Sequence, residues 1–177
     1  MIIERAVTNF EEEELLAPFG FKGGAMNRIW QYSVYLKTRE GQEAVGVGCQ
    51  GVLWSDAKVF ADHSPSAGCA MMYLVTEYAA KLLEGRSFET PWEAFDFLLP
   101  RAVKYAADIT GKKDLRLTFV AAFSLSMILI PLCCLYFRYC SLLWRHFQSF
   151  PLSFQNFYLL LFHGLSQSLQ PLLHQKD

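Results

Sequence analysis

Several short patterns in this sequence contain residue types that carry chemistry in other proteins. The segment from Gly46 to Gly51 reads Gly-Val-Gly-Cys-Gln-Gly and matches the G-x-G-x-x-G pattern of dinucleotide-binding turns. That turn also requires the first strand of a βαβ unit, a helix that opens at its last glycine and an acidic residue about 20 positions later for the ribose. Asp62 and Glu77 lie 11 and 26 positions after Gly51. We therefore interpret these glycines as the thin end of a strand.

Two carboxylates and an imidazole follow this strand, in Trp54-Ser55-Asp56 and Asp62-His63-Ser64. Their oxygen and nitrogen atoms could in principle hold a metal ion, but the H-E-x-x-H spacing and a third ligand are missing from the pattern. A lone loop histidine such as His63 is more often solvated or bonded within the structure. We therefore predict neither a metal ligand nor a catalytic residue in this chain.

The cysteines and the N-terminus bear on the cellular compartment. Cys49 and Cys69 are 20 residues apart, and the total of five cysteines is odd, so neither a zinc ribbon nor a disulfide framework is indicated. The first residues also lack a charged segment followed by an apolar stretch, which is the pattern of a cleavable signal. We expect free thiols and a cytoplasmic location, with membrane association through the C-terminal segment as the alternative.

The elements that must position these residues are predicted from hydrophobic periodicity. Strands are expected at residues 2–10, 30–38 and 43–50, because apolar side chains alternate and a Gly-containing turn separates the last two. An apolar stripe with a period of about 3.6 predicts a helix over residues 67–83, which Gly85 can end. The fold class is therefore α+β: a three-stranded antiparallel sheet followed by a helical bundle.

The start of a second helix is marked by a capping box. Thr90 is the predicted N-cap, Pro91 takes the first helical position, and Glu93 is expected to reach back to the cap amide. Pro100 lacks an amide hydrogen, so we expect a kink or restart there before Gly111 closes the helix.

This succession resembles the N-terminal capping domain of the enolase superfamily, in the mandelate racemase and muconate lactonizing enzyme branch that includes the dipeptide epimerases. The resemblance covers residues 1–120. It is carried by the opening strand at 2–10, the loop at 19–24, the hairpin at 30–51, the segment Gly-Val-Leu-Trp-Ser-Asp at 51–56, the helix at 67–83 and the step Leu-Leu-Glu-Gly-Arg at 82–86.

The resemblance implies a domain that closes over the mouth of a (β/α)7β barrel. In that family, a barrel Lys or His removes the proton α to a carboxylate, and Mg²⁺ stabilises the enediolate. The implied substrate is a small carboxylate, such as a dipeptide or a sugar acid. By resemblance the substrate pocket is lined by Phe19, Phe21, Lys22 and Trp54, while Gly23 and Gly24 give the first loop its mobility and Gly48 and Gly51 let the hairpin approach the barrel rim.

The composition changes after Val120. Residues 121–177 contain one acidic and three basic residues, and the stretch 117–137 has no charge and is long enough to cross a membrane. Residues whose codons begin, always or often, with a pyrimidine rise from 40% of the first 120 positions to 84% of the rest. We expect residues 121–177 to be a hydrophobic, non-homologous tail, explained by a changed reading frame, a membrane anchor or an unusual soluble helical region.

These observations predict a truncated enolase-superfamily isomerase of the racemase or epimerase type. It would keep the substrate-capping domain, lack the catalytic barrel and its Mg²⁺ site, and be inactive alone. The alternative is a small membrane-anchored binding or interaction module. A net charge of −1 and a pI near 6.4 do not favour nucleic-acid binding, and the sequence specifies no oligomeric state.

Overall fold

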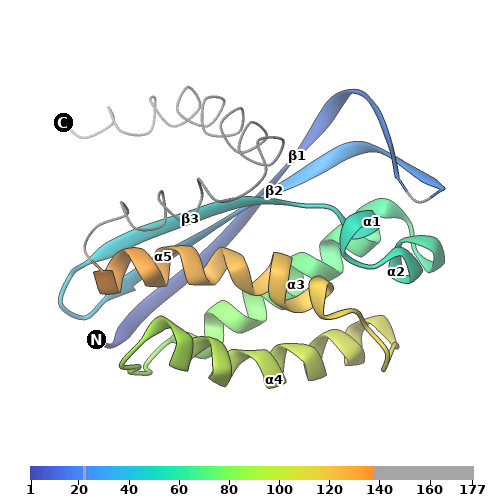
Figure 1. The fold of residues 1–177 in the computed structure, drawn as a ribbon. Coiled ribbons are helices and arrows are strands. Elements are labelled where there is room, and N and C mark those ends of the chain that lie inside the picture. The colour runs from blue at the N-terminus through green and yellow to red at the C-terminus, as the bar shows by residue number, and fades with distance from the viewer. Residues whose placement is uncertain (22, 138–177) are drawn as a thin grey trace. The chain divides into compact units, whose positions relative to one another are not determined.

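The computed structural model describes residues 1–21 and 23–137, which form a sheet with helices on one of its faces (Figure 1). The order of elements confirms the predicted fold class, because a three-stranded antiparallel sheet is followed by helices. The strands are β1 Ile3–Phe21, β2 Gly24–Thr38 and β3 Glu43–Gln50, in the sheet order β1-β2-β3. The helices are α1 Val52–Ser55, α2 Ala57–Asp62, α3 Pro65–Leu83, α4 Pro91–Thr110, the π-helix η1 Thr118–Leu125 and α5 Ser126–Phe137.

The central strand β2 shows the predicted alternation. Tyr32, Val34 and Leu36 are fully buried on the face that the helices cover, as side chains of period two on a half-buried sheet require. β2 pairs with β3 from Trp30 opposite Gln50 to Lys37 opposite Glu43. The hairpin predicted from the sequence is therefore confirmed, with the bounds of β3 as expected.

β1 is longer than predicted, and most of the segment at residues 19–24, expected to be a loop, is paired in strands. Phe19 pairs with Met26, and Phe21 pairs with Gly24, so this segment is the end of a β1–β2 hairpin. The register is irregular between Glu14 and Phe19. Pairing with β2 satisfies the backbone hydrogen-bonding groups of this glycine-rich segment. The sequence of β1 alone does not show that this partner is present.

The acidic run from Glu11 to Glu14 also lies in β1. Arg28 on β2 forms ion pairs with Glu12, at 3.2 Å, and with Glu14, at 2.8 Å. Cross-strand charge pairs of this kind offset the low strand propensity of glutamate.

Helix ends follow the predicted signals with two differences. Thr90 caps α4 by accepting from the Glu93 amide at 3.1 Å, but the Glu93 carboxylate accepts from the Glu89 amide, not from the amide of Thr90. α4 is one helix that runs through Pro100 to Thr110, so of the expected kink or restart at this proline the restart is wrong. Pro100 lies on the exposed side of α4, where water can bond the backbone carbonyl that the proline leaves without an amide partner.

η1 and α5 complete the core against β3. Phe119, Leu125, Ile128 and Leu132 are fully buried. A Cβ added at Gly46 would lie 2.6 Å from the Met127 carbonyl oxygen, and one at Gly48 would overlap the Met127 side chain. The thin strand end predicted from these glycines therefore makes room for α5, whereas the resemblance assigned Gly48 to a barrel rim.

The change of composition after Val120 falls inside one compact unit, which extends from Met1 to Arg138. Within residues 1–21 and 23–137, no helix combines the length and the hydropathy needed to span a bilayer. The remainder of the predicted tail, residues 138–177, lies outside the described residues, and its origin stays a prediction.

Candidate functional site

Of the predicted substrate-binding residues, Phe19, Gly23, Gly24 and Trp54 lie where the tip of the β1–β2 hairpin reaches α1 and α2 (Figure 1). Phe19 lies on β1 and Trp54 on α1. Their rings meet edge to face, with centroids 5.3 Å apart and planes at 68°. The Phe19 side chain keeps 43% of its surface exposed. The structure thus brings together two aromatic residues that are far apart in the sequence.

Gly23 and Gly24 have different roles in this hairpin end. Gly23 adopts a left-handed conformation, with φ of 80°, as the turn between the strands requires. Gly24 is in close contact with α1 and α2, because an added Cβ would lie 2.6 Å from Phe60 Cε1 and 3.2 Å from Leu53 Cδ1. Lys22 and the side chain of Phe21 lie outside the described residues, so their predicted place in the pocket is not tested.

Three further apolar residues of this region were missed by the sequence reading. Met26 is buried on β2, and its Cε would lie 3.1 Å from a Cβ added at Gly51. Leu53 is buried on α1, and Phe60 is half-buried on α2. The sequence feature that corresponds to them is a glycine facing each side chain: Gly24 faces Leu53 and Phe60, and Gly51 faces Met26. We call Phe19, Gly24, Met26, Leu53, Trp54 and Phe60 the tip cluster.

Glu12 connects the base of the hairpin end to the helices. Its carboxylate accepts hydrogen bonds from Trp30 Nε1 at 3.1 Å and from Ser66 Oγ at 3.4 Å, besides its ion pair with Arg28. Phe10 stacks on Trp30, with ring centroids 4.5 Å apart. Contacts to α3 therefore hold this part of the hairpin, and contacts to α1 and α2 hold the tip.

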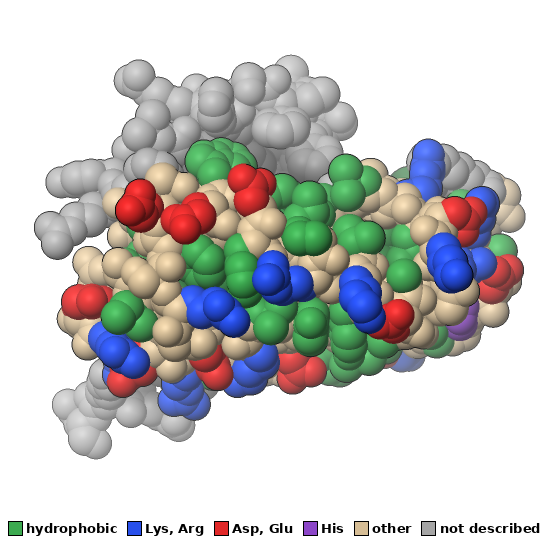
Figure 2. Space-filling model, turned by 90° about the horizontal axis from the view of Figure 1, so that it is seen from below, with side chains coloured by type: hydrophobic (Ala, Val, Ile, Leu, Met, Phe, Trp, Pro, Cys, Tyr) green, Lys and Arg blue, Asp and Glu red, His purple; other side chains and the backbone are tan. Residues whose placement is uncertain are grey.

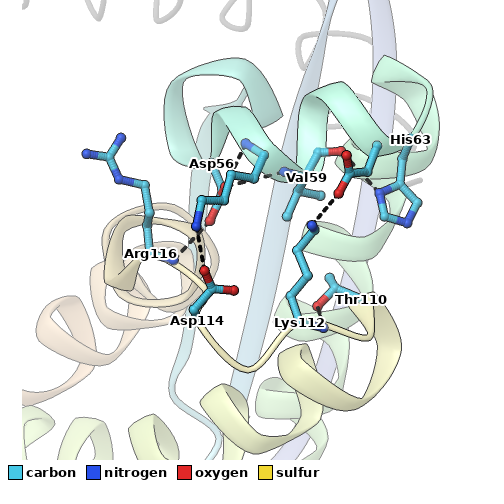
Figure 3. A network of polar contacts seen from close by, with 9 residues as sticks. Asp56, Val59, His63, Thr110, Lys112, Asp114 and Arg116 are labelled. Atoms are coloured by element: carbon cyan, nitrogen blue, oxygen red, sulfur yellow. Dashed lines mark hydrogen bonds and ion pairs between the residues drawn. The ribbon is translucent and has the colours of Figure 1, made fainter.

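Behind the tip cluster, a buried carboxylate ties α2 to the loop before η1 (Figure 3). Asp56 is 1% exposed and accepts from the amides of Lys58, at 2.9 Å, and Val59, at 3.3 Å, as the N-cap of α2. Its other oxygen accepts from the Arg116 amide at 2.9 Å. Thr118 Oγ1 donates to the Ser55 carbonyl at 2.6 Å. This corner fixes the position of α1, which carries Trp54.

Two exposed ion pairs flank the same corner. Lys58 pairs with Asp114 at 2.5 Å, and Lys112 pairs with Asp62. The hydrogen bond from each lysine lowers the pKa of its aspartate below the ordinary value. Opposite charge at short range favours the ionised carboxylate, which explains both directions.

The aspartates considered as metal ligands are therefore engaged in structural contacts. His63 Nδ1 lies 3.1 Å from the carbonyl oxygen of Val59. Within the described ranges, 1–21 and 23–137, no group of three His, Cys, Asp or Glu side chains is arranged to hold a metal ion. These residues do not fit the Mg²⁺ site that the resemblance implies for the whole enzyme. What the corner supplies is a rigid support for aromatic and apolar contacts.

The fold described above is similar to parts of several solved structures. No protein-family model and no curated protein matches the sequence. The chain is similar to the crystal structure of the dipeptide epimerase from Cytophaga hutchinsonii with Mg and the dipeptide D-Ala-L-Val. The identity is 17% and the TM-score 0.46, over 76% of this chain and 30% of that chain.

Two other solved structures are similar over the same kind of region. The L-Ala-D/L-Glu epimerase from Bacillus subtilis is 16% identical, with a TM-score of 0.41, over 73% of this chain and 30% of that chain. A mandelate racemase/muconate lactonizing protein from Herpetosiphon aurantiacus is 14% identical, with a TM-score of 0.42, over 62% of this chain and 28% of that chain. This chain therefore spans less than a third of the length of each of these proteins.

Proposed function

We propose that residues 1–137 are a substrate-covering domain of an enolase-type isomerase, of the racemase or epimerase kind, and that the tip cluster closes over the substrate. The proposed substrate is a small carboxylate, such as a dipeptide or a sugar acid. The groups that remove and return the α-proton are assigned to a barrel. The described residues form a sheet with helices and do not form a barrel.

The observation that carries this proposal is the contact between Phe19 and Trp54. Two segments separated by the whole β2–β3 hairpin deliver aromatic rings to one exposed end, with the rings 5.3 Å apart. Aromatic side chains provide large apolar contacts at a binding surface. The segments are those that the resemblance assigns to the pocket wall.

The physical contribution of such a domain is the exclusion of water. Removing a proton α to a carboxylate creates a dianionic, enediolate-like species, and its stabilisation by fixed charges is stronger where bulk water is absent. The Asp56 corner and the Glu12 contacts would hold the tip cluster in place, so that little ordering is left to occur when the substrate binds. The chain's own residues thus bind, orient and shield the substrate.

The first test concerns the chain alone. The full chain is incubated with Mg²⁺ and a panel of dipeptides and sugar acids in deuterated buffer, and α-deuteration is followed by NMR. We expect no exchange above a protein-free blank. Exchange above that blank would contradict the assignment of the catalytic groups to a barrel.

The second test places the domain on a barrel. Residues 1–137 replace the corresponding region of the Bacillus subtilis epimerase, and α-proton exchange is measured with a dipeptide panel. We expect exchange that depends on the tip cluster: Phe19→Ala and Trp54→Ala should raise KM about tenfold with a smaller effect on kcat. Trp92→Ala, which removes an exposed tryptophan on α4, is the matched control. A folded chimera in which Trp92→Ala and Trp54→Ala have equal effects contradicts the proposal.

A further inference from the structure

Two arginines lie against the same aromatic ring near the connection between α3 and α4. The guanidinium carbon of Arg86 is 4.5 Å from the centre of the Phe97 ring, and that of Arg101 is 3.9 Å from it. The Phe97 ring in turn packs on Phe88, with centroids 5.6 Å apart. One aromatic ring therefore contacts the guanidinium groups of both arginines.

Hydrogen bonds to the backbone fix the direction of both side chains. Arg86 Nε donates to the Leu82 carbonyl at 3.0 Å, and Arg101 Nη1 donates to the Phe97 carbonyl at 2.6 Å. Each guanidinium has five N–H donors, so most of the donors on both remain available. Both residues are exposed. Stacking and backbone contacts thus reduce the freedom that a ligand would otherwise have to remove.

Carboxylates do not neutralise this pair. Neither arginine is within ion-pair distance of an acidic side chain in the part of the chain that the structure describes. Glu84 accepts from Lys81 at 3.2 Å and from the Ala6 amide at 2.9 Å, and Glu93 accepts from the Glu89 amide. Seen from the side of α4, Lys and Arg side chains are interspersed with apolar side chains and with Asp and Glu side chains (Figure 2).

We infer that Arg86 and Arg101, which both contact the Phe97 ring, form a binding site for a phosphate group. Paired guanidiniums with free N–H groups match oxyanions, which accept several charge-assisted hydrogen bonds. A tetrahedral phosphate presents oxygens in several directions and can accept from both arginines, whereas a planar carboxylate matches the fork of one. The ligand is therefore inorganic phosphate or a phosphate monoester.

This site is independent of the proposed function. It lies beside the N-terminus, since Ser87 bridges to Ile2, whereas the tip cluster is at the other end of the sheet (Figure 1). Phosphate binding can therefore be tested on the full chain without any catalytic assay.

The experiment follows the arginine side-chain ¹H–¹⁵N resonances of the full chain during titration with inorganic phosphate, acetate or chloride at constant ionic strength. We expect saturable shifts of two arginine resonances with phosphate, at a Kd of about 1 mM, and much weaker shifts with acetate or chloride. Absence of saturation by phosphate up to about 50 mM, or equal shifts with acetate, overturns the inference. A parallel titration with phosphoserine separates a monoester from the free ion as the better ligand.

Variants locate the site. Arg86→Ala and Arg101→Ala should each weaken phosphate binding about tenfold or more, because each removes charge-assisted hydrogen bonds. Phe97→Leu keeps both charges and should weaken it about threefold by removing the stacking surface. Lys104→Ala removes one positive charge from the same helix, and binding should stay within about twofold. Equal losses in Lys104→Ala and Arg101→Ala would mean general electrostatic attraction and overturn the inference.

Where an alanine variant fails to fold, as judged by far-UV circular dichroism, Arg86→Lys and Arg101→Lys replace it. Lysine keeps the charge and the aliphatic stem but lacks the planar fork. Binding should then be several-fold weaker, and unchanged affinity in both lysine variants counts against the site.

Discussion

The two ends of the β1–β2 hairpin show how one pair of strands meets two environments. Leu36, near the open end of the hairpin, is fully buried beneath the helices, while Leu16, near its turn, is fully exposed. The open end packs into a continuous core with α3, α4 and α5. The turn end contacts the short helices α1 and α2 through the tip cluster. Stability is therefore concentrated in one half of the sheet, and the other half retains exposed aromatic surface suited to binding.

The sharpest test of this difference compares the two leucines. Leu36→Ala should lower the free energy of unfolding by about 2–5 kcal/mol, because it removes buried methyl groups and leaves a cavity. Leu16→Ala should change it by no more than about 0.5 kcal/mol, since that side chain is already in water. Urea unfolding followed by circular dichroism measures both. Similar losses in the two variants would mean that the turn end is not the less stable half.

Two glycines allow the packed half of the sheet and the turn end to be compared by adding a methyl group instead of removing side-chain atoms. Gly46→Ala should destabilise by about 1–3 kcal/mol, because its Cβ would press on the Met127 carbonyl and on Pro131 in α5. Gly20→Ala has nothing closer to the added Cβ than the Gly24 carbonyl, at 3.9 Å, and should be close to neutral. Thermal unfolding of the pair provides the measurement. A neutral Gly46→Ala would argue against close packing of α5 on β3.

The Asp56 corner should show an intermediate effect. Asp56→Ala removes the N-cap of α2 and leaves the Arg116 amide without its acceptor, at an expected cost of about 1–2 kcal/mol. Asp108→Ala removes an exposed carboxylate that pairs with Lys104 and should cost about 0.5 kcal/mol or less. Trp54 fluorescence should also shift in Asp56→Ala alone, since that corner supports α1. Unchanged stability in Asp56→Ala would show that the Asp56 hydrogen bonds do not hold this corner.

The smallest effect concerns pH. The hydrogen bond from Lys58 lowers the pKa of Asp114 below its ordinary value of 3.8, so this pair stabilises the folded state above that pH. The contribution should be lost as pH falls through the lowered pKa. Asp114→Asn and Lys58→Gln should each reduce the acid-induced loss of stability, and the double variant should add nothing further. Urea midpoints between about pH 7 and pH 3 measure the change. An additive double variant would show that the two residues do not act as a pair.

Local patterns predicted most of the secondary structure. The alternation of residues 30–38, the turn at Gly41 and the strand at residues 43–50 appear as predicted, because side-chain periodicity and turn chemistry act over a few residues. The ends of α3 and α4 at Gly85 and Gly111 are likewise as predicted, since both adopt positive φ. The length of β1 was wrong because a neighbouring strand decides it: β1 extends to Phe21 because β2 pairs with it.

The candidate site was only partly accessible from the sequence. Phe19 and Trp54 were named from the resemblance, and the structure places their rings in contact. Met26 and Phe60 were missed, because a buried apolar side chain carries no local sign of which distant glycine it will face. The same holds for the two arginines at Phe97, since their shared ring depends on how α3 and α4 pack.

The sequence by itself determined the types and order of the three strands and of the helices α3 and α4, because propensity, capping and hydrophobic period are properties of neighbouring residues. Only the tertiary structure decided what the glycines of β3 accommodate, which amides Asp56 accepts from and which aromatic rings meet at the hairpin end. These contacts join residues far apart in the sequence: Asp56 and Arg116 are separated by 60 positions, and Gly46 and Pro131 by 85. Their geometry exists only after the intervening chain has packed, so no local pattern can encode it.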